Sequence, residues 1–386
     1  MALLTHVDLT RRGFIAAAAS HGLIASGLLS AQAVELAPRD KQGPGLKVPP
    51  PLGKKVGWAI VGIGRLTLGQ IMPAFAEAEQ SRAAALVSGH PDKAKATAER
   101  YGVDPKAIYT YENYDKLKDN DDVQAVYIVL PNSMHAEYTI RALEAGKHVL
   151  CEKPMCVTVD EAKKMRDAAK SANRKLMIAY RVRHEPYNQA AIELAKSKKL
   201  GKVKMITANN LQNTRAPNIR LSKALGGGPL GDVGVYCLNA TRFLTGEEPV
   251  EFTATIVQPK DEPRFAEVPE SVLWTQRFPS GVTAACACSF GMTGSKFYRV
   301  ACENGWFGLD NAYGYSGQRM FVSDGDGLRE LTFPRVNHFA KEMDHFSDCI
   351  LNDKVPITPG EDGLADMKAC AAIEQAGHAG KTVRVA

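Results

Sequence analysis

Beyond its first forty residues, the sequence lacks any apolar run long enough to cross a lipid bilayer. A membrane-spanning helix needs about 20 consecutive apolar residues, so we expect no membrane segment in the mature protein. The chain also lacks the bias of disordered or fibrous proteins, because 45% of its residues are hydrophobic and 23% are charged. At about 150 residues per domain, a length of 386 residues predicts two or three domains.

Cysteine is present, but not in patterns that bind metals or build a disulfide framework. None of the eight cysteines forms a C-x-x-C pair, and no spacing of cysteine and histidine matches a zinc site. Most of them lie in apolar strand-like or helical patterns, where cysteine behaves as a small hydrophobic residue. We therefore predict buried free thiols and no metal site.

The basic residues are not concentrated in one part of the sequence. Its 48 basic residues exceed its 42 acidic residues by six, and they are scattered along the chain. Nucleic-acid-binding proteins usually gather such residues into a stripe or patch, so we expect no nucleic-acid partner. The small positive excess favours an anionic ligand.

Residues 1–33 have the layout of a bacterial export signal. The pair Arg11 and Arg12 precedes a weakly apolar stretch at 16–29, and small residues at 31–33 suit a signal peptidase. The arginine pair indicates the twin-arginine route, so we expect export of the folded protein to the periplasm. A mitochondrial presequence, or a chance arginine pair before an alanine-rich helix, is the alternative.

A Pro-rich arm occupies residues 34–53, and we interpret it as a linker or as an extended segment lying on another surface. Two different patterns of secondary structure follow it. Residues 54–180 alternate near-continuous apolar strands with helices, which predicts a Rossmann-type, doubly wound parallel sheet. Residues 181–386 contain short strands with brief connections. This predicts an α+β domain with an open, mainly antiparallel sheet, and its helices are expected near 232–245, 336–352 and 361–378.

A glycine-rich loop at Gly62 and Gly64 follows the first apolar strand. In a dinucleotide fold, the first glycine permits a tight turn, and the second lets the backbone approach a pyrophosphate at the N-terminus of the next helix. Thr67 stands where the third glycine is expected, which weakens the match. Because of its position between strand and helix, we predict that this loop binds a dinucleotide, with Arg65 and Leu66 as further contacts.

The end of the second strand favours NADP over NAD. NAD enzymes place Asp or Glu there to bind the ribose 2′-hydroxyl, but this chain has Ser88, followed by Lys93 in the next helix. A hydroxyl and an ammonium group suit a 2′-phosphate, which a carboxylate would repel. The alternative is that Ser88 only caps a turn and that Lys93 is solvated.

Three residues suit hydride transfer from an alcohol. Lys153 follows a strand, and ligands of open α/β sheets bind beyond the carboxyl ends of strands. Asp232 and Tyr236 share one face of an expected helix, after a loop at 226–228 that we expect to be mobile. A phenol is a poor base at neutral pH until a nearby cation lowers its pKa, so we predict that Lys153 activates Tyr236. The alternative is that Asp232 and Tyr236 have only a structural role.

The chain thus carries Gly62-x-Gly64, Glu152-Lys153-Pro154 and Asp232-x-x-x-Tyr236 in that order. In this setting the motifs resemble the glucose–fructose oxidoreductase / inositol dehydrogenase / MocA-type family. Within it, they are most similar to the branch of periplasmic glucose–fructose and aldose–aldose oxidoreductases, which Tyr236 marks. Further stretches support the resemblance: 130–137, 145–149, 175–181 and 246–249. Residues 209–225 depart most from the family pattern.

The resemblance implies an NADP-binding N-terminal domain and a C-terminal domain whose open sheet serves in oligomerisation. It implies proton transfer by Lys153 and Tyr236, and placement of a sugar by Asp232. It also implies a cofactor site lined by residues that follow several strands: Leu130, Asn132, His135, Glu152, Lys153 and Arg181, with Tyr111 covering the cofactor.

Export and a redox cofactor together suggest how the protein works. Free NADP is not expected outside the cytosol, so we expect the protein to fold around NADP(H), hold it tightly and recycle it. One sugar would be oxidised to its lactone, and a second would be reduced to a polyol in a ping-pong reaction. The arm at 34–53 could help to retain the cofactor. The alternatives are a one-way NADP-dependent aldose or inositol dehydrogenase, and a non-catalytic sugar sensor.

Overall fold

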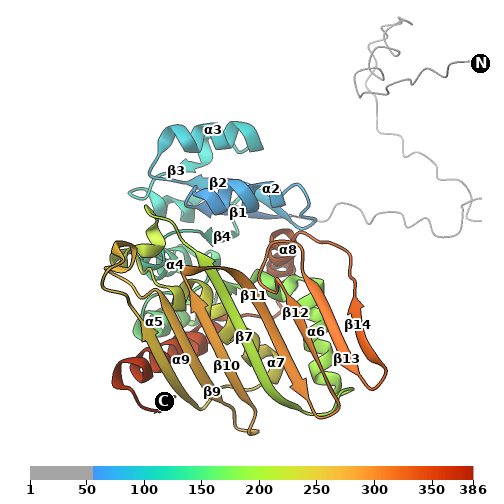
Figure 1. The fold of residues 1–386 in the computed structure, drawn as a ribbon. Helices are drawn as coiled ribbons and strands as arrows, with labels where there is room; N and C mark the ends of the chain where they lie inside the picture. The colour runs from blue at the N-terminus through green and yellow to red at the C-terminus, as the bar shows by residue number, and fades with distance from the viewer. Residues whose placement is uncertain (1–54, 386) are drawn as a thin grey trace, which may run out of the picture. The chain divides into compact units, whose positions relative to one another are not determined.

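The computed structural model describes residues 55–385 and arranges their strands in a six-stranded and a nine-stranded sheet (Figure 1). The predicted leader at 1–33 and the arm at 34–53 lie outside the described residues. Among the described residues, no helix is both long and apolar enough to span a membrane.

The six-stranded sheet confirms the predicted Rossmann-type domain. All its strands are parallel, in the order β3-β2-β1-β4-β5-β6. Strand β1 is buried at every position, as expected for an apolar strand covered on both faces. The strand order reverses between β1 and β4, and ligands of such folds bind beyond the strand ends at this point. The elements are β1 (Val56–Val61), β2 (Ser81–Val87), α3 (Pro91–Tyr101), β3 (Ile108–Tyr109), β4 (Ala125–Ile128), α4 (His135–Glu144), β5 (His148–Glu152), α5 (Val159–Ser171) and β6 (Leu176–Ala179).

The helical segment after β1 is shorter than the amphipathic pattern suggests. It consists of a π-helical turn, Thr67–Ile71, and a short α2, Met72–Ala74. The amide of Met72 donates to the carbonyl of Thr67, five residues earlier, and Pro73 has no amide hydrogen to continue the ladder.

The nine-stranded sheet confirms the open, mainly antiparallel arrangement. Its order is β14-β13-β12-β11-β7-β10-β9-β8-β15, and its β7–β10 pair is parallel. Helices α6, α7 and α9 lie behind it in Figure 1, and its other face is not covered by any helix among residues 55–385. Helix α6 (Pro186–Ser197) and β15 (Val383–Arg384) were not foreseen. The other elements are β7 (Val203–Asn213), α7 (Val235–Thr245), β8 (Glu251–Val257), β9 (Ser271–Arg277), β10 (Thr283–Ser289), β11 (Gly291–Cys302), β12 (Gly305–Asp310), β13 (Arg319–Asp324) and β14 (Gly327–Leu331).

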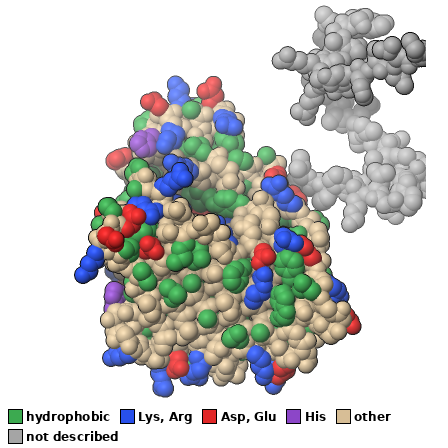
Figure 2. Space-filling model, viewed as in Figure 1, with side chains coloured by type: hydrophobic (Ala, Val, Ile, Leu, Met, Phe, Trp, Pro, Cys, Tyr) green, Lys and Arg blue, Asp and Glu red, His purple; other side chains and the backbone are tan. Residues whose placement is uncertain are grey.

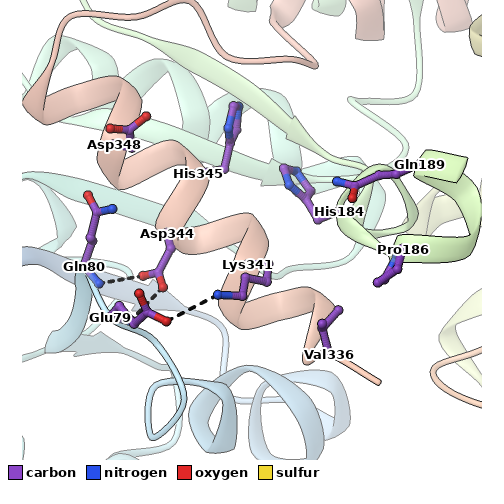
Figure 3. A pocket seen from close by; sticks show the side chains of 10 residues that line it. All are labelled: Glu79, Gln80, His184, Pro186, Gln189, Val336, Lys341, Asp344, His345 and Asp348. Atoms are coloured by element: carbon purple, nitrogen blue, oxygen red, sulfur yellow. Dashed lines mark hydrogen bonds and ion pairs between the residues drawn. The ribbon is translucent and has the colours of Figure 1, made fainter. Parts of the chain in front are cut away.

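The last helices of the chain return to the parallel sheet. In α8 (His338–Leu351), the Asp344 carboxylate accepts hydrogen bonds from the backbone amides of Glu79 and Gln80, at 2.7 and 2.9 Å (Figure 3). Helix α9 (Gly360–Ala379) packs against α5 and β6. These contacts connect the two C-terminal helices to the parallel-sheet domain.

The eight cysteines carry free thiols, as the sequence pattern predicts. Seven are buried and Cys302 is partly exposed. Burial raises the pKa of these thiols, to about 12 for Cys237. They therefore act as small apolar side chains in the core.

Candidate active site

The loop after β1 has the geometry of a dinucleotide-binding turn. Gly62 has a φ of +94°, and a Cβ atom there would lie 2.3 Å from the carbonyl oxygen of Val129. Only glycine fits this position. Gly64 is exposed, and nothing lies within 4 Å of the place where its Cβ would be. The space beside Gly64 fits a pyrophosphate approaching the first amides of the helical turn.

Thr67, at the place of the third glycine, braces this loop. Its buried hydroxyl donates to the carbonyl of Gly62 at 2.6 Å. The departure from the fingerprint is thus compensated by a hydrogen bond inside the turn. Arg65 is exposed and Leu66 partly exposed at the start of the same helical segment, where both are open to a bound phosphate.

The end of β2 offers a site for an adenosine ribose, with one departure from the expected chemistry. The Ser88 hydroxyl accepts from the amide of His90 at 3.0 Å, so Ser88 is engaged in a turn. Lys93 is exposed on α3. The Tyr111 ring lies against Gly89, 3.0 Å from where a Cβ would stand. Tyr111 therefore lies beside the end of β2, and recognition of a 2′-phosphate by Ser88 and Lys93 stays a prediction.

The segment after β4 contributes both exposed and buried side chains. Leu130 is partly exposed and lies against Gly62. The Asn132 amide donates to the carbonyl of Gly226 at 2.8 Å. His135 is fully buried, and its ring nitrogens lie 2.8 Å from the carbonyl of Pro154 and 2.9 Å from that of Leu130. A neutral imidazole has one N–H, so His135 donates to only one of these carbonyls. Direct contact of His135 with a cofactor is corrected to a positioning role, because its side chain has no exposed surface.

Lys153 and Asp232 meet beyond the carboxyl end of β5. The Lys153 ammonium donates to the backbone carbonyl of Asp232 at 2.8 Å and to its carboxylate at 3.1 Å. Burial would lower the pKa of Lys153, but the negative charge of Asp232 raises it above its usual value. Lys153 is therefore a firmly protonated cation.

Asp232 lies between two cations. Its second carboxylate oxygen accepts from Nε of Arg220 at 2.6 Å. Burial would raise the pKa of Asp232, but Lys153 and Arg220 outweigh it and lower the pKa below its usual value. An ionised carboxylate thus balances two positive groups at this point.

Tyr236 completes the cluster. Its ring lies under the Lys153 ammonium, which is 4.9 Å from the ring centroid, and beside the Arg181 guanidinium at 5.6 Å. Tyr236 is 8% exposed, and its hydroxyl makes no hydrogen bond with residues 55–385. Arg181 donates to the backbone carbonyls of Tyr313 and Gly314, so it also secures that loop.

The loop at 226–228, which we expected to be mobile, is held by backbone hydrogen bonds. The amide of Gly228 donates to the carbonyl of Arg220, and the amide of Gly227 donates to that of Ser222. Close packing against these carbonyls requires glycine, since a Cβ at Gly227 would lie 2.4 Å from the carbonyl oxygen of Arg220. The loop fixes the segment that carries Arg220.

Three further side chains face this cluster and were not identified from the sequence. Arg220 binds Asp232, and Tyr315 is half exposed, with the Arg181 guanidinium 4.4 Å from its ring centroid. Lys296 on β11 is partly buried, and burial followed by the charge of Arg181 lowers its pKa. Arg220 lies in a short 3-10 helix, Ile219–Leu221, and Tyr315 in a loop, and no local pattern reveals the position of either segment.

The surface is hollowed between the parallel-sheet domain and the nine-stranded sheet (Figure 2). A separate cavity of about 420 Å³ lies between α6, α8 and the start of β2 (Figure 3), and neither Lys153 nor Tyr236 lines it. Within residues 55–385, no group of three or more His, Cys, Asp or Glu side chains is placed to hold a metal ion.

Comparisons with known proteins place this geometry in context. Residues 56–180 match the model of an oxidoreductase family with an NAD-binding Rossmann fold, GFO/IDH/MocA, and residues 188–308 match the GFO/IDH/MocA C-terminal domain. D-xylose 1-dehydrogenase (NADP(+)) of Haloarcula marismortui is 31% identical, over 86% of this chain and 93% of its own. D-xylose 1-dehydrogenase (NADP(+)) 2 of Haloferax volcanii is 30% identical, over 85% and 99%.

Among solved structures, the aldose–aldose oxidoreductase of Caulobacter crescentus, complexed with glycerol, is similar with a TM-score of 0.83. It is 42% identical to this chain, and the match covers 86% of this chain and 100% of that one. The similarity includes both sheets, because it extends over nearly all described residues.

Proposed function

The chain belongs to the GFO/IDH/MocA family of oxidoreductases, and on this premise we propose that it is an NADP-containing oxidoreductase of sugars. The observation that carries the proposal is the cluster of Lys153, Asp232 and Tyr236 at the carboxyl ends of the parallel strands. NADP would be held by the glycine loop and the end of β2, and it supplies the acceptor and donor of the hydride. The relatives that oxidise D-xylose and the aldose–aldose oxidoreductase support sugars as the substrate class.

The cluster provides the proton transfer that hydride transfer needs. When a sugar hydroxyl is oxidised to a carbonyl, its proton must leave the oxygen. The Tyr236 side chain takes this proton as a phenolate and becomes the neutral phenol, and the fixed positive charge of Lys153 stabilises the negative charge on the phenolate or on the sugar oxygen. Because the groups interact closely, the proton belongs to the cluster rather than to one residue.

We propose that oxidation at the anomeric carbon gives a lactone, and that a second sugar then takes the hydride and becomes a polyol. The arginine pair near the N-terminus supports this cycle. A protein exported by the twin-arginine route to the periplasm would have to carry its NADP with it and regenerate it in place. We propose that the arm at 34–53 contributes to retention.

A one-way NADP-dependent aldose dehydrogenase with an exchangeable cofactor is the second candidate. The D-xylose dehydrogenases among the relatives favour it. In this case NADPH leaves after each turnover, and added NADP is required.

Absorbance in the dihydronicotinamide band separates the two candidates. Freshly purified protein receives an aldose with no added cofactor, and a second sugar afterwards. A signal that appears and then vanishes supports the two-sugar cycle. A signal that requires added NADP supports the dehydrogenase, and no signal under either condition overturns the proposed function. Deleting residues 34–53 should release NADP on gel filtration, and full occupancy after deletion would remove the role of the arm.

We also propose a homo-oligomer formed through the uncovered face of the nine-stranded sheet. In Figure 2, hydrophobic side chains gather on this face. Met205 on β7, Leu273 on β9 and Val257 on β8 are exposed on strands of this sheet. A second copy of the chain would bury this apolar surface.

A further inference from the structure

Two buried carboxyl groups, one of which directly precedes Lys153 in the chain, share contacts with one tyrosine hydroxyl. Glu342 of α8 and Glu152 of β5 lie on either side of the Tyr127 hydroxyl. The distance from this hydroxyl is 2.9 Å to Oε1 of Glu152 and 3.4 Å to Oε2 of Glu342. Tyr127 and Glu342 are 0% exposed, and Glu152 is 9% exposed.

If both carboxyl groups were ionised, the single hydrogen of the Tyr127 hydroxyl would have to serve two carboxylates. A phenol has one hydrogen to donate, and the shorter contact directs it to Glu152. The contact between Tyr127 and Glu342 then lacks a hydrogen unless Glu342 supplies it. The other oxygen of Glu342 is buried without a partner, which an uncharged acid tolerates far better than a carboxylate.

We propose that Glu342 is a positioning residue that carries a proton and, through the hydroxyl of Tyr127, holds the Glu152 carboxylate in place beside Lys153. The hydrogen bonds then run in one direction, from Glu342 to Tyr127 and from Tyr127 to Glu152. That Glu152 faces the cofactor rests on the proposed function, whereas the protonation of Glu342 does not.

The surroundings support this direction. Burial, followed by the charge of Glu152, raises the pKa of Glu342 well above its usual value, and Arg181 and the Tyr127 hydroxyl oppose this only in part. Burial also raises the pKa of Glu152, but Lys153, the Tyr127 hydroxyl and Arg181 oppose that rise. The charged and titratable groups facing the pair therefore stabilise the negative charge on Glu152 and leave the proton on Glu342.

The arrangement links α8 to the reaction site. Glu342 lies on the same helix as Asp344, which anchors α8 to the start of β2. Glu152 precedes Lys153 directly, so a displaced Glu152 would shift the backbone that carries the Lys153 ammonium. Glu342 thus acts on the reaction through Tyr127 and Glu152 and needs no contact with the substrate.

Infrared spectroscopy of the purified holoprotein tests the protonation directly. We expect a carbonyl stretch of a protonated carboxylic acid at neutral pH in the wild type and in Glu152→Gln, and its loss in Glu342→Gln. The exposed Glu193 on α6 offers a matched control, because Glu193→Gln should leave the band unchanged. A wild type without the band, or loss of the band in Glu152→Gln instead, would overturn the proposal.

Kinetics of hydride transfer test the positioning role. Glu342→Gln keeps a donor to Tyr127 and should stay within about threefold of the wild-type kcat, whereas Glu342→Leu should lower kcat about tenfold at unchanged KM. Tyr127→Phe removes the donor to Glu152, so the acid limb of the pH profile should move up by about one unit. An equal loss in the Gln and Leu variants, or an unmoved acid limb, would contradict the role.

These outcomes are separable from failure of the proposed function. If the protein transfers no hydride from sugars, the infrared band and its loss in Glu342→Gln still decide the protonation of Glu342. If the band is absent while the enzyme turns over sugars, only the inference about Glu342 fails.

Discussion

The Lys153 ammonium is held by two acceptors of a single residue, the backbone carbonyl and the side-chain carboxylate of Asp232. The carbonyl fixes where the ammonium lies, and the carboxylate sets its charge state. Because the carboxylate also binds Arg220, one negative charge holds two cations at the site. The positive charge beside Tyr236 therefore depends on Asp232.

Replacing Asp232 with Asn tests this dependence. The amide keeps the shape but leaves Lys153 and Arg220 without a balancing charge, and breaking a buried ion pair in this way costs about 3 kcal/mol of stability. We expect kcat/KM to fall about 100-fold while NADP remains bound. Urea unfolding, steady-state kinetics and the cofactor content after gel filtration check these outcomes. Unchanged kinetics would show that Asp232 has no part in the reaction.

Replacing Tyr236 with Phe removes the phenol oxygen and keeps the ring, so it tests the role of the hydroxyl alone. The ring contacts with Lys153 and Arg181 remain, so the fold and the cofactor site should be preserved. Loss of the proton-transferring hydroxyl should lower kcat by about 100-fold or more, with little change in KM. Single-turnover reduction of bound NADP by an aldose gives the relevant rate. A rate equal to that of the wild type would assign the proton transfer elsewhere.

Replacing Thr67 with Val tests the brace inside the glycine loop. The carbonyl of Gly62 then loses its donor in a buried place, which costs about 1–2 kcal/mol. We expect lower stability and easier loss of NADP on dialysis. Thr67→Ser keeps the hydroxyl and is the matched control. If Val and Ser behave alike, the hydrogen bond does not hold the loop.

The Rossmann-type domain was predictable because its information is local. Each apolar strand and each amphipathic helix shows its period within a few residues, and Gly62 can be recognised from its place after β1. Lys153, Asp232 and Tyr236 could be chosen because their residue types suit one reaction. Their proximity was inferred, and the structure brings them together.

The remaining features depend on contacts between distant parts of the chain. The Trp58 indole donates to Ser347 across 289 positions, which no periodic pattern indicates. Arg220 was missed because its short 3-10 helix is held in place by hydrogen bonds from the amides of Gly227 and Gly228. His135 was misjudged because a histidine next to a cofactor motif looks the same in sequence whether its nitrogens face a ligand or the backbone.

Buried neutral histidines should make the protein sensitive to acid. Burial, followed by the charges of Arg181 and Arg335, lowers the pKa of His338 from 6.5 to about 4. In the unfolded chain the same imidazole binds a proton at higher pH, so the unfolded state gains protons first as the pH falls. The stability from this residue is therefore complete above pH 6.5 and is lost between about pH 6.5 and 4, to a total of about 3 kcal/mol.

Urea unfolding at several pH values between 7.5 and 4 measures this loss. Nδ1 of His338 lies 3.3 Å from Nη1 of Arg181, and Asn offers an acceptor at a similar position. We expect His338→Asn to flatten the pH dependence of the unfolding free energy in this range. His378 is exposed on α9, so His378→Gln should reproduce the wild-type curve. A His338→Asn curve as steep as that of the wild type would place the acid sensitivity in other groups, because His338 would then not change its charge on unfolding.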